Sequence, residues 1–339
     1  MPPRPRISIL LPFRDAAATL PECLDSIRAQ TETGWELVAV DDHSVDASPA
    51  LVRAMAREDP RVRLVHNPGR GLVAALNHGL HACRCELVAR MDADDLMHPE
   101  RLAAHLNHFA RDPGLVLSAT QAELFSREEI QAGFREYMRW QNACLTHEQI
   151  ARDLYIESPF AHPSVAFRRR AVLDASGYRE GPFPEDYDLW LRLFHAGRRM
   201  EKIPRALLRW RDHPRRLSRT DPRCSREAFD RLRANYLARD PRFLAHRENF
   251  VIWGAGRKTR RRADHLLEQG FRPRAWIDID PRKIGNRVEE IPVVDSRWLE
   301  ENGRPFVLVY VTNHGAREEI LEELEGMGYR PGEACLAVG

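Results

Sequence analysis

The stretch from Ile7 to Ile27, ISILLPFRDAAATLPECLDSI, sets the pattern of the chain. Its first seven residues are apolar except for Ser8, and such a nearly continuous apolar run is typical of a strand buried on both faces of a sheet. Four apolar residues then recur at the i, i+3, i+4, i+7 spacing of one helix face, namely Leu20, Cys23, Leu24 and Ile27. A buried strand followed by a covering helix is the repeating unit of parallel sheets.

The same alternation continues along the N-terminal part of the chain. Further strands are predicted at WELVAV (35–40), RVRLV (61–65), CELVARM (85–91) and GLVLSAT (114–120), with helical patterns between most of them. Strands that alternate with helices at this spacing favour an α/β fold. We therefore expect a doubly wound, mostly parallel sheet with helices on both faces.

A second alternating unit begins at Asn249. The run NFVIWGAG (249–256) reads as a strand and a glycine turn, and RKTRRRADHLLEQG (257–270) as a helix that ends at a glycine. Shorter strands and one more helix follow. We expect a main domain over 1–224, a charged helical linker over 225–248, and a small Rossmann-like α/β domain over 249–339.

Composition excludes several classes of protein. The 52 basic and 50 acidic residues leave a net charge of +2, which gives no reason to expect nucleic acid as a partner. No apolar run reaches the roughly 20 residues of a membrane span. The six cysteines are scattered, which favours reduced thiols over a disulfide framework or a zinc site. These features predict a cytoplasmic protein.

Acidic residues follow three of the predicted strands. Asp15 comes after the first. Asp42 comes after the second, and Asp92 and Asp94 come after the fourth, within MDADDL. Ligands of such sheets bind outside the carboxyl ends of the strands. Residues i and i+2 of an extended stretch point the same way, so Asp92 and Asp94 are placed to share a hard cation such as Mg²⁺. The alternative is a solvated turn, in which Asp95 caps the next helix.

Five stretches together resemble the family 2 glycosyltransferases of the GT-A fold over roughly residues 6–220. They are SILLPFRDAAATLPECLDSI, WELVAVDDHSVDAS, GLVAALNHGL, ELVARMDADDLMHPERL and PEDYDLWLRL. The resemblance implies that Pro12, Phe13 and Asp15 form the nucleotide-facing loop, although the Tyr and Asn usual there are absent. It further implies that Asp42 pairs with the nucleobase.

The resemblance also implies which residues contact the donor's diphosphate and the metal. Asp92 matches the acid near the ribose and metal, and Asp94 matches the direct ligand of Mn²⁺ or Mg²⁺. Within RWRDHPRRLS, His213 matches a further metal ligand and Arg211 a contact of the nucleotide-sugar. A solvated basic tail is the alternative for these last two residues.

Glu185 and Asp186 resemble the family's Glu-Asp pair, in which the Asp is the general base. A carboxylate within hydrogen-bond reach can take the proton of an attacking hydroxyl. The alternative is that both acids only favour a helix start. The implied activity is inverting transfer of a sugar from a nucleotide-diphospho-sugar, with UDP as the first choice. A glycan or a lipid-linked molecule would accept the sugar, and the protein would then touch the inner face of the membrane peripherally.

The stretch WGAGRKTRRR suggests a different class of function. Gly254 and Gly256 follow a strand and open a helix, and Asp278 closes the next strand, as in a dinucleotide-binding turn. Thr259 stands where the third glycine of that motif would be. A dinucleotide-binding or sensing protein, or an oxidoreductase, is therefore the alternative to a glycosyltransferase. A regulatory or docking role for this unit is also open.

Overall fold

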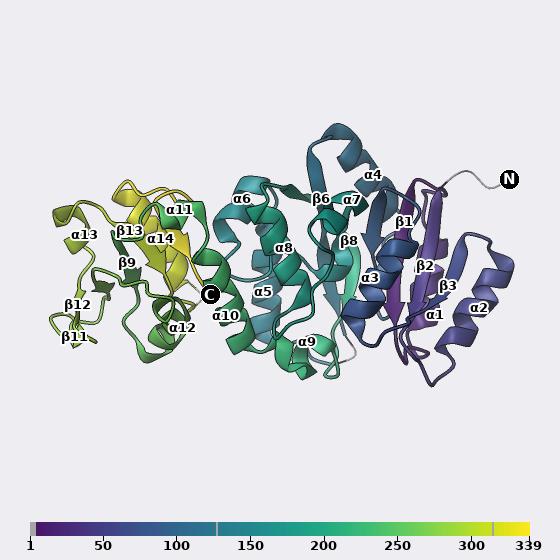
Figure 1. The fold of residues 1–339 in the computed structure, drawn as a ribbon, viewed down its shortest axis with the longest axis horizontal. Coiled ribbons are helices and arrows are strands. Elements are labelled where there is room, and N and C mark those ends of the chain that lie inside the picture. The colour runs from purple at the N-terminus through teal and green to yellow at the C-terminus, as the bar shows by residue number, and fades with distance from the viewer. Residues whose placement is uncertain (1–4, 127, 314) are drawn as a thin grey trace. The chain divides into compact units, whose positions relative to one another are not determined.

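The structure is a computed structural model that describes residues 5–126, 128–313 and 315–339 (Figure 1). The chain divides into two compact units. The first comprises residues 1–150, 159–181 and 185–220, and the second comprises residues 151–158, 182–184 and 221–339. Each unit is described by itself.

The first unit is built on an eight-stranded sheet of order β3-β2-β1-β4-β7-β6-β8-β5. Its strands are β1 (Ile7–Phe13), β2 (Trp35–Asp41), β3 (Val62–His66), β4 (Leu87–Arg90), β5 (Leu96–Met97), β6 (Leu115–Phe125), β7 (Ala166–Arg168) and β8 (Arg199–Arg211). β7 runs antiparallel to β4 and β6, and β5 runs antiparallel to β8; the other neighbours are parallel. This confirms the expected mostly parallel α/β architecture.

Helices pack against both faces of this sheet. They are α1 (Leu20–Arg28), α2 (Ser48–Glu58), α3 (Leu72–Ala82), α4 (Arg101–Arg111), α5 (Ala132–Ala143), α7 (Arg169–Asp174) and α8 (Glu185–His195). The unit also holds the short helices η1 (His162–Ser164) and α9 (Leu217–Thr220), and α6 (His147–Asp153) begins in this unit and ends in the second. Ile9 of β1 shares an apolar cluster with Leu24 of α1 and Leu106 of α4. The side chain of Leu10 points the other way, toward α3.

Gly79 explains the close approach of α3 to the sheet. A Cβ atom at this position would collide with Leu10 Cδ1 and would lie 2.7 Å from Val40 Cγ2. Only a residue without a side chain lets the helix pack this tightly against β1 and β2. The apolar strand runs of the sequence are therefore covered on both faces, as a doubly wound sheet requires.

The second unit holds a six-stranded sheet of order β11-β12-β10-β9-β13-β14, in which only the β11–β12 pair is antiparallel. Its strands are β9 (Phe250–Trp253), β10 (Trp276–Ile277), β11 (Arg287–Val288), β12 (Ile291–Val294), β13 (Phe306–Val309) and β14 (Cys335–Ala337). Its helices are η2 (Pro222–Cys224), α10 (Arg226–Leu237), α11 (Pro241–Leu244), α12 (Arg257–Leu267), α13 (Trp298–Glu301) and α14 (Ala316–Gly326).

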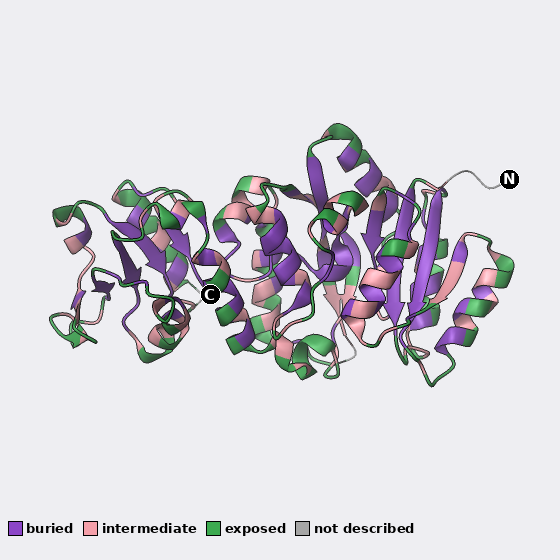
Figure 2. Cartoon of the chain, in the orientation of Figure 1, coloured by how far each residue is buried: buried purple, intermediate pink, exposed green. Residues whose placement is uncertain are grey.

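The segment 225–248, expected to be a linker, forms α10 and α11 and belongs to the second unit. The carboxylate of Asp230 on α10 pairs with Arg233 of the same helix and lies 3.8 Å from Arg262 Nε on α12. In both units the buried residues gather on the strands and on one side of each covering helix (Figure 2). Among the described residues, no helix combines the length and the apolar character needed to cross a membrane.

Candidate active site

Three carboxylates converge just beyond the carboxyl end of β4. Asp92, Asp94 and Asp95 each offer one oxygen, and these oxygens lie within 4.8 Å of one another. The side chains of Asp92 and Asp94 are each 32% exposed, whereas Asp95 is buried. Like charges at this separation repel by about 1 kcal/mol in water and by more near a protein interior. The surroundings must therefore offset this charge.

Two buried arginines lie behind these acids. Arg90, the last residue of β4, donates from Nη2 to Asp92 Oδ1 at 2.6 Å and from Nη1 to the carbonyl oxygen of Met91. Arg101 of α4 donates from Nη2 to the carbonyl oxygen of Arg90 at 2.8 Å. Both guanidinium groups are almost completely enclosed, at 1% and 0% exposure. They supply positive charge on the inner side of the acidic cluster.

The end of β8 closes the cluster from the other side. The backbone N–H of Arg211 donates to Asp95 Oδ1 at 2.7 Å, and Arg211 Nε donates to the carbonyl oxygen of Asp94 at 2.6 Å. His213 Nε2 lies 3.1 Å from Asp94 Oδ2. The second terminal nitrogen of Arg211 pairs with Glu22 of α1 at 2.6 Å. Arg211 therefore anchors the acidic loop, and much of its hydrogen-bonding capacity is already used within the protein.

The expectation that Asp95 caps the following helix is wrong. The short strand β5 (Leu96–Met97) comes directly after it, and α4 begins only at Arg101, with Glu100 at the N-cap position. The carboxylate of Asp95 instead accepts the backbone N–H of Arg211. A partner from β8, far away in the sequence, overrides the local pattern that suggested a cap.

Ionisation of the carboxyl groups in the acidic cluster is disfavoured by burial and by their mutual repulsion. Burial raises the pKa of Asp94, and the neighbouring Asp92 raises it further, while His213 acts in the opposite direction. Burial raises the pKa of Asp95 well above its usual range, and the charges of Asp94 and Asp92 add smaller effects in the same direction. A cation would relieve both effects. Carboxylate oxygens suit Mg²⁺ or Mn²⁺, so Asp92 and Asp94 fit a divalent cation. His213 Nε2, beside Asp94 Oδ2, could add a nitrogen ligand.

The residues expected to face the nucleotide follow β1 and β2. Pro12 and Phe13 are buried at the end of β1, and the carbonyl oxygen of Phe13 accepts the N–H of Asp42 at 2.9 Å. Asp15 lies beyond them with a φ of 48°, and its Oδ1 accepts the N–H of Val45 at 2.8 Å. Asp15 thus fastens the loop after β2 to the loop after β1.

Asp42 is buried and anchors the loop between β3 and α3. Its carboxylate accepts Asn67 Nδ2 at 2.7 Å and the N–H of Gly71, 3.0 Å from both oxygens. Gly71 has a φ of 87°, a conformation that favours glycine. The carboxylate is held in a fixed orientation at the edge of the sheet where a ligand is expected.

Glu185 and Asp186 lie in the first turn of α8. Asp186 remains partly exposed, and one of its own carboxylate oxygens accepts the N–H of Tyr187 at 2.7 Å. Removal from water raises the pKa of Asp186 to about 7, the charge of Glu185 adds to this effect, and Arg90 opposes it. A carboxylate with a pKa near neutral is suited to take a proton at physiological pH.

Several buried polar residues lie next to Glu185 and Asp186. His162 Nε2 lies 3.0 Å from the Tyr178 hydroxyl, and His162 Nδ1 lies 4.0 Å from Glu185 Oε1. Asn77 holds the backbone of Tyr178 through two hydrogen bonds, of 2.9 Å to its N–H and 2.8 Å to its carbonyl oxygen. Asn77 of α3 therefore has a structural role here.

The carboxylate of Asp278 accepts hydrogen bonds from the glycine turn and from the residues that follow β10. Asp278 Oδ2 accepts the N–H of Ala255 and the ammonium of Lys283, both at 2.9 Å, and its Oδ1 accepts the N–H of Asp280. This carboxylate is the group that a dinucleotide-binding turn would use for a ribose. Three donors within the second unit therefore already use acceptor positions of this carboxylate.

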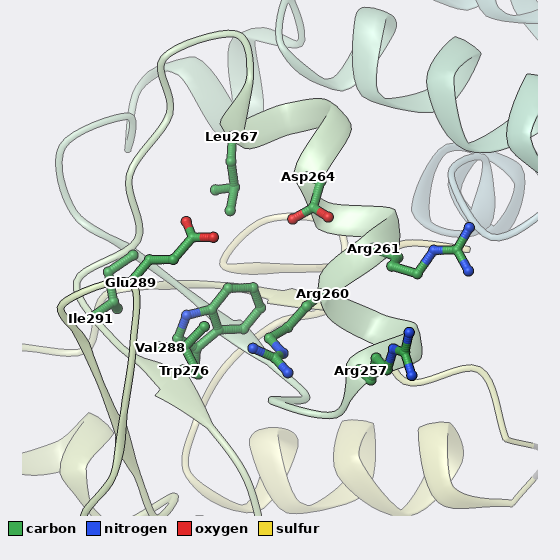
Figure 3. Close-up of a pocket in the computed structure, with 9 residues that line it drawn as sticks. All are labelled: Arg257, Arg260, Arg261, Asp264, Leu267, Trp276, Val288, Glu289 and Ile291. Carbon is green, nitrogen blue, oxygen red and sulfur yellow. The ribbon is translucent and has the colours of Figure 1, made fainter.

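A small cavity of about 140 Å³ lies along α12. Figure 3 shows Arg260, Asp264 and Leu267 of α12 opposite Trp276, with Glu289 on the facing hairpin. In the part of the chain that the structure describes, none of its lining residues belongs to the turn Gly254–Gly256. The cavity is therefore separate from the glycine turn that suggested a dinucleotide.

Known proteins match the first unit. The family model "Glycosyl transferase family 2" matches residues 8–177, half of the chain. The amylovoran biosynthesis glycosyltransferase AmsE of Erwinia amylovora is 31% identical over 206 residues, 60% of this chain and 75% of that protein. The UDP-Gal:alpha-D-GlcNAc-diphosphoundecaprenol beta-1,3-galactosyltransferase of Escherichia coli is 27% identical over 207 residues, 60% of this chain and 73% of that protein.

Two solved structures share the fold. The mannosyltransferase PcManGT of Pyrobaculum calidifontis, in complex with GDP-Man and Mn²⁺, aligns with a TM-score of 0.51 at 22% identity and covers 69% of this chain. This chain spans 62% of PcManGT, less than two thirds of its length. S. aureus TarS 1-349, in complex with UDP-GlcNAc, aligns with a TM-score of 0.56 at 15% identity over 70% of this chain and 67% of that one.

Sequence reasoning missed Arg90, Arg101 and Glu22. The charge of Arg90 inside the apolar run LVARM was the available signal, since a charged residue inside a buried strand requires a partner. The sheet, the acidic loop and the match over residues 8–177 agree. The chain therefore belongs to glycosyl transferase family 2, and we assign it to the glycosyltransferases.

Proposed function

We propose that the protein transfers a sugar from a nucleotide-diphospho-sugar to an acceptor hydroxyl, with inversion at the anomeric carbon. The observation that carries this proposal is the acidic loop at the carboxyl end of β4. Asp92 and Asp94 are partly exposed, His213 Nε2 lies 3.1 Å from Asp94 Oδ2, and the pKa of Asp94 is raised by burial and by Asp92. Such a loop favours a divalent cation and the diphosphate that it would bind.

We propose Asp92, Asp94 and His213 as the residues that hold Mn²⁺ or Mg²⁺. When bound, the cation supplies Lewis-acid stabilisation of the departing nucleoside diphosphate. The complex of PcManGT with Mn²⁺ supports the use of a divalent cation in this fold. Arg211 keeps the loop in place through its bonds to Asp94 and Asp95, and contacts the donor only if it gives up its pairing with Glu22.

Asp186 acts as the general base in this proposal. Its carboxylate takes the proton of the acceptor hydroxyl while that oxygen attacks the anomeric carbon. The bond from the anomeric carbon to the diphosphate oxygen breaks, and the oxygen leaves with the bonding electrons. Attack from the face opposite the leaving group inverts the centre. Glu185 shares the first turn of α8 and raises the pKa of Asp186, after the larger effect of burial.

The donor is proposed to be a UDP-sugar. Asp42 presents a fixed carboxylate that can accept from a nucleobase N–H, and Pro12, Phe13 and Asp15 form the neighbouring wall. The relative from E. coli is named for UDP-Gal, and TarS is seen with UDP-GlcNAc. PcManGT is seen with GDP-Man, so GDP-sugars belong in the same test.

The acceptor is proposed to be a glycan or a lipid-linked glycan. The names of two relatives refer to amylovoran biosynthesis and to a diphosphoundecaprenol-linked sugar. A lipid-linked acceptor would be reached by peripheral contact with the membrane.

A panel of UDP-, GDP- and dTDP-sugars with Mn²⁺ tests the proposal through slow donor hydrolysis. The wild-type protein should release nucleoside diphosphate from one class of donor, and Asp94→Ala should not. Release that is equally fast in Asp94→Ala would contradict the proposed metal site.

A further inference from the structure

The small cavity along α12 in the second unit is closed at its base and open at its rim. Trp276 of β10 lines it with only 1% exposure, whereas Asp264 of α12 and Glu289 of the β11–β12 hairpin line it from exposed positions. Its volume is about 140 Å³, well below the roughly 300–1,000 Å³ of sites that hold drug-sized ligands. The cavity therefore has room for one small ring and excludes a whole nucleotide-sugar or dinucleotide.

Two N–H donors in the wall of this cavity are unused. Nε of Arg260 and Nε1 of Trp276 are both buried, and neither has a hydrogen-bond partner among the described residues. Figure 3 shows Arg260 beside Trp276, while Arg257 and Arg261 extend away from the indole ring. A buried donor without an acceptor is costly, and a ligand oxygen within reach would restore the missing hydrogen bond.

Two carboxylates in the wall are also unused. Burial raises the pKa of Asp264, and the charge of Glu289 raises it further, so the two acids lie close enough to repel each other. In the part of the chain that the structure describes, neither carboxylate forms a salt bridge or accepts a hydrogen bond. Both can therefore accept hydrogen bonds from a ligand.

Glu289 reaches the cavity from a strained turn. Glu289 and Glu290 are the two residues between β11 and β12, and their φ values are 48° and 66°. Hairpin turns with a positive φ at both central positions usually carry Asn-Gly or Asp-Gly, because other residues rarely adopt this conformation. Strain of this kind concentrates at functional sites, so the turn supports a binding role for Glu289.

The charges around the cavity favour an uncharged ligand. Its lining includes three arginines and two carboxylates, so an anion would meet the acids and a cation would meet the guanidinium groups. A ligand with several hydroxyl groups suits both, because a hydroxyl can donate to a carboxylate and accept from an N–H at the same time. A nucleobase gains much of its affinity by stacking on an aromatic ring. Trp276 offers no open ring face at 1% exposure.

We propose that the cavity along α12 binds one neutral sugar ring, with Arg260 and Trp276 as hydrogen-bond donors and Asp264 and Glu289 as acceptors. The apolar part of the lining would pack against the C–H groups of the ring. The exposed rim lets the rest of a glycan continue into solvent. This site lies within the second unit and uses none of the residues proposed to bind the donor or to take the proton.

Saturation-transfer NMR on the full chain tests the inference with the methyl glycosides of glucose, galactose, mannose and N-acetylglucosamine. At least one of them should bind the wild-type protein. Its affinity should fall by about 10-fold or more in Asp264→Ala and in Arg260→Met, as expected for the loss of a hydrogen bond that involves a charged group. Neither residue is fully buried, so both variants should fold.

Glu268→Ala and Lys258→Met are the matched controls. Glu268 and Lys258 carry the same charges as Asp264 and Arg260, lie on or at the end of α12, and are exposed without lining the cavity. Both control variants should bind the glycoside as the wild-type protein does. Asp186→Ala should also bind it, because Asp186 lies in the first unit.

The inference is overturned if no glycoside binds, or if Asp264→Ala and Arg260→Met bind one as tightly as the controls do. Uridine is the probe for the nucleobase alternative. Binding of uridine that Asp264→Ala abolishes, without binding of any glycoside, would also overturn the inference. The NMR titration requires no turnover. Failure of the proposed function, seen as absent donor hydrolysis in the wild-type protein, would therefore leave the glycoside result unaffected.

Discussion

His213 and Asp94 lie 119 positions apart in the sequence, yet Nε2 of His213 is 3.1 Å from Oδ2 of Asp94. The contact joins the end of β8 to the loop after β4. Two partly exposed groups that can both bind metal ions meet where the sheet is expected to receive its ligand.

Asp94→Asn and His213→Ala should weaken the binding of Mn²⁺ in the presence of UDP. Loss of either direct ligand should cost at least the roughly 10- to 100-fold in metal affinity that loss of a hydrogen-bond partner of a ligand typically costs. Calorimetric titration of Mn²⁺ measures both. Asp174→Asn is the control, since Asp174 pairs with Arg170 on α7 at the protein surface and should leave the titration unchanged. Unaltered Mn²⁺ affinity in His213→Ala would remove this histidine from the metal site.

Asp186→Asn should abolish transfer without weakening donor binding. Loss of a general base costs typically about 10²- to 10⁴-fold in rate. The same preparation should show the wild-type thermal shift with nucleoside diphosphate and Mn²⁺, because Asp186 lies on the acceptor side in our account. Transfer at the wild-type rate would show that another group takes the proton.

Asp186 should also make stability depend on pH. Its pKa is raised to about 7 in the folded protein, above the value of about 3.9 of an unfolded chain, so the folded state binds this proton more tightly. Its contribution to stability is therefore present at low pH and is lost as the pH rises through about 7. Asn cannot ionise. The Tm of Asp186→Asn relative to wild type should therefore rise between about pH 5 and pH 8. If the difference in Tm between Asp186→Asn and wild type stays constant over this range, the raised pKa does not belong to Asp186.

Local pattern was enough to predict most of the first unit. The apolar run Ile7–Phe13 and the helical spacing that begins at Leu20 are short-range signals, and the structure forms β1 and α1 there. Asp92 and Asp94 were also placed correctly at the end of a strand. Asp95 was misplaced because its partner, the N–H of Arg211, is 116 residues away. Similarly, nothing local in residues 151–158 shows that they belong to the second unit.

Asp42→Ala should raise the KM for the donor by about 10-fold or more, because one buried hydrogen bond to a charged group contributes about 1.5–3 kcal/mol. Asn67→Ala is the matched control. It removes one hydrogen bond from the same loop but keeps the carboxylate. Steady-state kinetics should show a smaller rise in KM for this control. Equal effects would mean that Asp42 acts only by holding the loop 67–71.

NAD(H) should not stabilise the protein. The carboxylate of Asp278 already accepts from Ala255, Asp280 and Lys283, so a ribose would have to compete with these donors. Differential scanning fluorimetry at millimolar NAD⁺ and NADH measures this directly. A rise in Tm that persists in Asp94→Ala would favour the dinucleotide-binding alternative for the second unit.

Thermal unfolding with nucleoside diphosphates measures whether the acidic loop binds a divalent cation and a diphosphate together. We expect UDP or GDP with Mn²⁺ to raise Tm by about 5 °C or more at about 100 times Kd, and neither component alone to do so. Asp94→Ala should abolish the combined effect. The acidic loop would not be the donor site if no nucleoside diphosphate shifted Tm with Mn²⁺ or Mg²⁺, or if the shift needed neither the metal nor Asp94.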